Sequence, residues 1–99
     1  MDIFFELHGI RFVANRDKAI ANPARHDGIT FEQAAEAFFD PFLKLLDASR
    51  NDESRDAIIG MNGSWQLLFV VHLQIEDDRI RLISARKATR EERKHYEDG

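Results

Sequence analysis

The sequence predicts one α+β domain in which an antiparallel sheet carries helices on one face and a short helix follows at the C-terminus. Three observations indicate this class: two short apolar runs at the start, two helix-start signals after them, and strict apolar alternation in the second half. The 99 residues fit a single domain, 1–99, and 43% hydrophobic with 32% charged residues is typical of a globular protein.

The chain is expected to begin with a β-hairpin. Residues 3–7 and 10–13 are apolar, strand-like runs, and the pair His8-Gly9 between them suits a two-residue turn.

A first helix is expected over residues 16–26. Asn15 precedes it as an N-cap, and Gly28 follows as a terminating glycine. Pro23 lies inside this range and removes one backbone donor, so we expect a kink or break there.

A second helix is expected after Thr30, which forms a capping box with Gln33. Asp40-Pro41 is expected to end it. One apolar face at helical spacing is expected in the core: Phe31, Ala34, Ala35, Phe38 and Phe42.

The second half predicts four strands and a terminal helix. Asn62-Gly63 is a strong hairpin signal, Glu76 to Asp78 suits a turn, and a second capping box at Thr89 and Glu92 starts a helix to about Tyr96. The strands are expected at residues 42–46, 55–60, 65–75 and 79–88. The predicted order is therefore ββααββββα.

Several classes of protein are excluded by composition. The chain has no cysteine, so a disulfide framework, a thiolate zinc site and cysteine catalysis are ruled out. No apolar run approaches the roughly 18 residues of a membrane span, and the start lacks the basic region of a signal peptide. We expect a cytoplasmic protein without membrane contact.

The charge is unevenly distributed along the chain. The net charge is −4, with 7 basic and 14 acidic residues in positions 1–78, but 7 basic and 2 acidic residues in positions 79–95. A basic stretch on an acidic body is either a footprint for nucleic acid or the solvated face of a helix, and composition leaves both open.

His72 and a set of arginines are the first candidate site residues. His72 lies on the mixed face of the strand at 65–75, where an imidazole either transfers protons or forms a buried structural contact. Arginine binds phosphate through two parallel hydrogen bonds, and a patch beside a histidine suits phosphodiester cleavage. The arginines concerned are Arg55, Arg79, Arg81 and Arg86.

The first helix supplies a second candidate surface. Lys18, Asn22 and Arg25 recur at helical spacing with His26 beside them, so this face either meets RNA or is ordinary surface. No pair of histidines has metal-ligand spacing, and no glycine-rich phosphate loop or nucleophile motif is present. We therefore expect no metal and no cofactor, and a structural role for Ser84.

From Phe12 onward the chain resembles the BrnT-type toxins, which are ribonucleases of type II toxin–antitoxin modules with a RelE/ParE-like fold. The matching residues are Asn15, Lys18, Ala19, Asn22, Arg25 and His26, then Phe31 to Ala34 with Phe38, Phe39 and Asp40, then Arg55, Ile59-Gly60, Arg81 to Ala88, Glu92 and Tyr96.

The resemblance implies an endoribonuclease that arrests translation and is neutralised by a cognate antitoxin. Such antitoxins carry a ribbon-helix-helix part, and we expect a heterotetramer that binds operator DNA through the antitoxin and represses its own operon. We expect Lys18, Asn22, Arg25, Arg79 and Lys87 to contact the RNA.

As a mechanism we expect metal-independent cleavage that leaves a 2′,3′-cyclic phosphate. Arg55, Arg81 and Arg86 would hold the phosphate and His72 would transfer a proton, with His26 or Lys18 as the second group.

Two other functions remain open. One is a non-catalytic corepressor that binds antitoxin, which the departures from the family pattern at Ala14 and Asp27 motivate. The other is a gyrase poison of the ParE-like kind.

Overall fold

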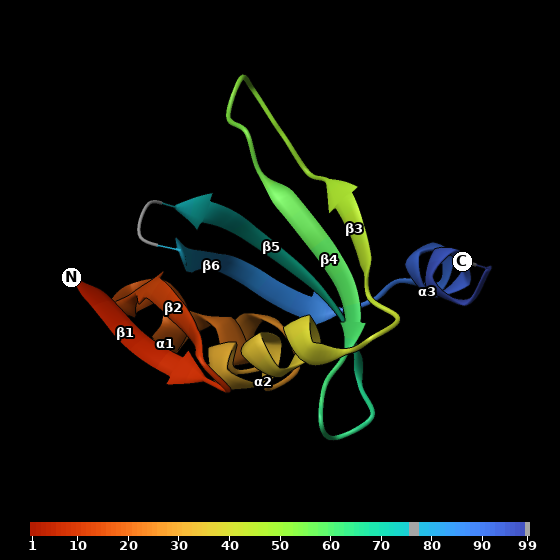
Figure 1. Cartoon of the computed structure of the whole chain (residues 1–99), viewed down its shortest axis with the longest axis horizontal. Helices are drawn as coiled ribbons and strands as arrows, with labels where there is room; N and C mark the ends of the chain where they lie inside the picture. The colour runs from red at the N-terminus through yellow and green to blue at the C-terminus, as the bar shows by residue number, and fades with distance from the viewer. Residues whose placement is uncertain (76–77, 99) are drawn as a thin grey trace.

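A computed structural model describes residues 1–75 and 78–98 and shows an α+β fold (Figure 1). The predicted class is thus confirmed. In chain order the elements are β1 (Asp2–Leu7), β2 (Ile10–Asn15), α1 (Arg16–Arg25), α2 (Phe31–Glu36), the 3₁₀ turn η1 (Ala37–Phe39), β3 (Lys44–Asp47), β4 (Asp56–Met61), β5 (Leu67–Ile75), β6 (Arg79–Lys87) and α3 (Arg90–Asp98).

The six strands form one mixed sheet in the order β1-β2-β6-β5-β4-β3. Every neighbouring pair is antiparallel except β2 and β6, which run parallel. The expectation of a wholly antiparallel sheet was therefore wrong. Apolar alternation indicates that a segment is a strand, but it does not indicate its partner. Here the N-terminal hairpin lies beside the last strand rather than beside β3 (Figure 1).

Both predicted hairpins are present. His8 and Gly9 have positive φ angles of 49° and 84°, as a tight turn between β1 and β2 requires. The β4–β5 connection is wider than two residues, with Trp65 in the left-handed region at φ 62°. The side-chain oxygen of Asn62 accepts hydrogen bonds from the backbone N–H groups of Ser64 and Gln66, which holds this loop in shape.

The three helix starts are capped as predicted. Asn15 accepts from the backbone N–H of Lys18, and capping boxes form at Thr30 and at Thr89. Of the kink or break expected at Pro23, the break does not occur, since α1 continues through Pro23 to Arg25. Pro23 lies near the end of the helix, where few helical bonds remain to be lost.

The core lies between one face of the sheet and the segment formed by α2 and η1. Phe12, Phe31 and Leu68 are fully buried there. Gly60 allows β4 to lie close to η1, because a Cβ atom at this position would lie 2.5 Å from the backbone oxygen of Ala37 in η1.

Two expectations about this part of the fold were wrong. Phe42 does not belong to the apolar helix face: η1 ends at Phe39, and Phe42 is 72% exposed in the following turn. The helices are also not gathered on one face, because α1 lies along an edge of β6 and α3 packs near β4. The expected turn at Glu76 to Asp78 falls largely on Glu76 and Asp77, which lie outside the described residues.

In the part of the chain that the structure describes, no helix is long and apolar enough to cross a membrane.

Candidate nucleic-acid interface

The pairing of β5 with β6 decides which side chains share the open face of the sheet. Val71 lies opposite Ser84 and Phe69 lies opposite Arg86, so these four residues share one face. The register then shifts by one residue beyond Val71, which leaves Ile83 without a partner in β5. This irregularity interrupts the simple alternation that the sequence suggested for β6.

His72 lies on the opposite face, under η1. It is 6% exposed, and its ring meets the ring of Phe38 edge to face at 4.9 Å between centroids. Its Nδ1 atom lies 3.3 Å from the carbonyl oxygen of Val70. Burial lowers the pKa of His72 below 6.5. The contact with Val70 and a nearby aspartate would raise this pKa, but burial outweighs them. The expected patch of arginines beside His72 is therefore not formed.

Asn22 joins α1 to the edge of β6. β2 pairs with β6 only as far as Ala14 and Leu82, so the edge beyond that point needs other partners. The Asn22 amide donates to the carbonyl oxygens of Ala85 and Ile29 at 2.8 Å each, and its oxygen accepts from the N–H of Ala85 at 3.2 Å. Because Asn22 is 4% exposed and fully engaged, it positions α1 and is not available to RNA.

Two adjoining hollows on the open face share Arg55 and Ser84, and together we call them the Arg55 groove. The larger encloses about 430 Å³ and the smaller about 240 Å³. The larger is lined by Asp47, Ala48, Ser49, Arg50, Arg55, Phe69, Val71, Ser84 and Arg86. The smaller is lined by Lys18, Ala21, Asn22, Arg25, His26, Arg55, Ile83 and Ser84.

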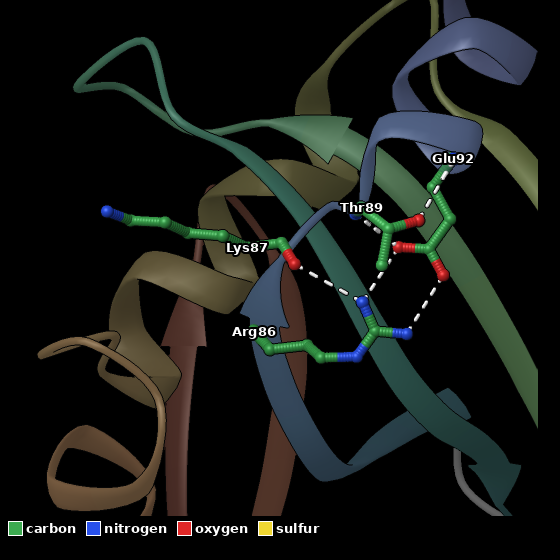
Figure 2. Close-up of polar contacts among 4 residues, drawn as sticks. All are labelled: Arg86, Lys87, Thr89 and Glu92. Carbon is green, nitrogen blue, oxygen red and sulfur yellow. Dashed lines mark hydrogen bonds and ion pairs between the residues drawn. The ribbon is translucent and has the colours of Figure 1, made fainter.

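Arg86 lines the groove, and Glu92 of α3 fixes the orientation of its guanidinium group. Its guanidinium donates to both carboxylate oxygens of Glu92, at 2.7 and 2.8 Å (Figure 2). It also lies 4.3 Å above the ring centre of Phe69. Burial raises the pKa of Glu92, but hydrogen bonds from Arg86 and Thr89 outweigh it, so the net shift is downward. The ion pair raises the pKa of Arg86.

Arg55 lies where the two hollows meet. Its guanidinium binds Glu53 at 2.7 Å, but the Glu53 side chain is 66% exposed. An exposed pair of this kind contributes only about 0–1 kcal/mol, so a phosphate can replace the carboxylate at little cost.

The smaller hollow brings Lys18, Arg25 and His26 of the first helix toward Arg55. Lys18 and Arg25 are exposed and His26 is half-buried. No ion pair involving Lys18 or Arg25 is found within residues 1–75 and 78–98. These cations are therefore free to bind a ligand.

Three other basic residues that we expected at the site lie outside the groove. Arg81 forms a two-point ion pair with Asp2, at 2.8 and 3.2 Å, which raises its pKa. Arg79 lies 5.2 Å from the ring centre of Phe4. Lys87 is exposed at the end of β6.

Sequence reasoning missed part of the lining. Ser49 and Arg50 lie in a polar loop that carries no motif, and only the fold brings this loop to β5 and β6. Ser84, expected to be structural, lines both hollows.

The groove suits a polyanion, because five Lys or Arg residues and one aspartate line it. The hydrogen bond from Ser49 lowers the pKa of that aspartate, Asp47. Among the described residues, no three His, Asp or Glu side chains gather as a metal site would require.

Comparison with known protein families places this geometry in context. Residues 15–92 match a family described as the ribonuclease toxin BrnT of type II toxin–antitoxin systems. This range contains α1, the strands β3, β4, β5 and β6, and every residue that lines the groove. No curated protein matches the chain.

Proposed function

The chain belongs to the BrnT family of ribonuclease toxins, and from this premise we propose that it cleaves RNA in the Arg55 groove without a metal ion. The observation that carries the proposal is the convergence of Lys18, His26 and Arg55 on one polar hollow. Cations are needed to hold a phosphodiester, and an imidazole is the side chain best suited to move protons near neutral pH.

In the proposed reaction the RNA supplies its own nucleophile. The 2′-oxygen attacks the adjacent phosphorus and its proton passes to His26, while the bond from phosphorus to the 5′-oxygen breaks and that oxygen takes up a proton. The products are a 2′,3′-cyclic phosphate and a 5′-hydroxyl. Arg55 and Lys18 stabilise the negative charge that develops on the phosphate.

This assignment differs from the expectation based on sequence at two residues. His72 and Arg81 were both expected to be catalytic, but His72 packs under Phe38 and Arg81 is paired with Asp2 outside the groove. We therefore propose His26 as the proton-transfer group. Arg86 remains a candidate for phosphate binding because it lines the groove.

The test is incubation of purified protein with single-stranded RNA in EDTA. Removing one preorganised donor costs about 10²–10³-fold in rate, and removing a proton-transfer group about 10²–10⁴-fold. We expect losses of this size in Arg55→Ala and His26→Ala, whereas Arg81→Ala and His72→Gln, if folded, should cleave within about threefold of the wild type.

Three results would contradict the proposal. RNA that stays intact with folded wild-type protein would favour the corepressor or the gyrase poison. A need for added Mg²⁺, or products that end in a 3′-hydroxyl, would exclude the cyclising mechanism. Full activity in Arg55→Ala would move the site elsewhere.

The type II family implies a cognate antitoxin. We propose that this antitoxin is a ribbon-helix-helix protein, that the two form a heterotetramer in the cytoplasm, and that the complex represses its own operon. Size measurement of the co-expressed pair and a binding assay on operator DNA test these points.

A further inference from the structure

A second surface, apolar and acidic, lies at the other end of the sheet from the Arg55 groove. We call it the Trp65 hollow. It encloses about 390 Å³ and is lined by Leu7, His8, Glu36, Phe39, Asp40, Pro41, Met61, Asn62, Gly63 and Trp65. None of these residues lines the groove.

Trp65 is the most exposed aromatic side chain at this surface, at 85% exposure, and Phe39 beside it is 38% exposed. Single exposed apolar side chains are ordinary, but apolar side chains that gather into one patch mark a contact surface, and Trp65 and Phe39 line the same hollow. Trp65 also has a positive φ of 62°, which is costly for a bulky residue. The fold therefore holds this indole outward at a cost in free energy.

The backbone of the loop that carries Trp65 is fixed by hydrogen bonds in the free protein. Asn62 binds the backbone of the loop, and the N–H of Gly63 donates to a carboxylate oxygen of Glu36 in α2 at 3.0 Å. An aromatic side chain on a backbone that is already ordered costs less conformational entropy on binding, and tryptophan is typical of interface hot spots.

The charge of the hollow decides what kind of partner fits. Glu36 and Asp40 lie in its lining, and no lysine or arginine does. Hydrogen bonds from Tyr96 and from the backbone outweigh burial and lower the pKa of Asp40, so it stays ionised. An RNA backbone would be repelled here, whereas a protein segment with apolar side chains and a Lys or Arg would be complementary.

The hollow and the groove are separated along the sheet. β4 runs from Asp56, next to Arg55, to Met61 in the hollow, and the loops at its two ends lie at opposite ends of the molecule (Figure 1). A partner bound at Trp65 therefore contacts a surface that the RNA site does not use.

We propose that the Trp65 hollow is the docking surface for the antitoxin, which inserts apolar side chains against Trp65 and Phe39 and a cationic side chain toward Glu36. The inference rests on the proposed function only in that a toxin has an antitoxin. It does not depend on how RNA is cleaved.

Fluorescence tests the proposal directly, because Trp65 is the only tryptophan of the chain. The probe is the antitoxin encoded in the same module, made without tryptophan. On titration we expect a blue shift of the emission and protection from iodide quenching, because docking removes the indole from water. Trp65→Ser should weaken binding by about 30-fold or more, the loss typical of a hot-spot residue.

Ile20 provides a matched control, since it is an apolar side chain with 65% exposure in α1 and lines neither the Trp65 hollow nor the Arg55 groove. Ile20→Ser should bind the antitoxin as the wild type does. Trp65→Ser should cleave RNA at the wild-type rate, which also shows that it is folded.

Several outcomes would overturn the proposal. These are antitoxin binding without a spectral shift, a shift caused by an RNA oligonucleotide, or a shift that depends on toxin concentration alone and so reports a second copy. If the wild type binds antitoxin with the expected shift but leaves RNA intact, the docking surface stands and the ribonuclease mechanism fails.

Discussion

Asp40 connects three parts of the fold. Its carboxylate accepts hydrogen bonds from the hydroxyl of Tyr96 at 2.5 Å and from the backbone N–H groups of Met61 and Phe42. It thereby fixes α3, the end of β4 and the turn after η1 to one another. Two residues of the family resemblance, Asp40 and Tyr96, thus have a structural explanation that needs no role in catalysis.

The Tyr96–Asp40 contact predicts an unusual titration. Burial, and then the hydrogen bond and negative charge of Asp40, together raise the pKa of Tyr96 to about 12. Tyr96 is the only tyrosine, so its ionisation is measured from ultraviolet absorbance after a rapid pH jump. Asp40→Asn should lower the midpoint toward 10, and an unchanged midpoint would show that the carboxylate is not the cause.

His72 predicts a loss of stability in mild acid. Because burial holds its pKa below 6.5 in the folded state, the unfolded chain binds more protons once the pH falls below about 6.5. The free energy of unfolding should therefore fall with decreasing pH in this range, and should not change on this account above it. Urea denaturation at pH 7.5 and 5.5 measures the effect.

His72→Gln is the comparison for this prediction, since glutamine does not titrate. Its stability should change less between the two pH values than that of the wild type. Equal changes in both proteins would show that His72 does not contribute to the acid sensitivity.

At the scale of elements, the side chain of Asn22 in α1 extends the hydrogen bonding of the sheet beyond the end of β2. Where β2 ends, the amide of Asn22 binds both backbone groups of Ala85, as a further strand residue would. The same contact sets the position of Lys18 and Arg25 relative to β6. A helix is thereby fixed to a strand edge by one residue.

Asn22→Ala should destabilise the protein by about 3 kcal/mol, because it leaves buried backbone groups of Ala85 and Ile29 without partners. Gln33→Ala, which removes only part of a capping box, should cost about 1 kcal/mol. Urea denaturation compares the two. Equal losses would show that the bonds to β6 contribute no more than a helix cap.

At the scale of the molecule, the charge is organised by the fold rather than by sequence segments. Of the basic stretch at 79–95, only Arg86 lines the groove, and the other cations come from α1 and the loop before β4. The acidic Trp65 hollow involves the loop between β4 and β5. This loop lies at the opposite end of β4 from the loop between β3 and β4 (Figure 1). Within the described residues, the fold thus gathers cations at the Arg55 groove and carboxylates at the Trp65 hollow, although the net charge is −4.

This arrangement predicts the salt dependence of cleavage. If Lys18, Arg25 and Arg55 each bind one phosphate, log(kcat/KM) should fall with log salt with a slope of about −2, since each contact to single-stranded RNA contributes about −0.7. Lys18→Gln should reduce the slope by about 0.7, whereas Lys87→Gln should leave it unchanged. A slope near zero would contradict RNA binding in the groove.

The sequence by itself determined the local structure. The α+β class, the caps at Asn15, Thr30 and Thr89, and the hairpins at His8-Gly9 and after Asn62 all depend on contacts within a few residues. It also indicated Lys18, Arg25, His26 and Arg55, which the fold brings to one groove, although their chemistry remains a proposal.

Only the tertiary structure decided which strands pair and which face each side chain joins. The parallel pairing of β2 with β6, the register shift beside Ile83 and the burial of His72 depend on residues far apart in the chain. The apolar alternation in the sequence shows that side chains change face at each residue. It does not show which face the helices will cover. That choice, set by packing free energy over the whole domain, separated His72 from the arginines and brought α1 to Arg55.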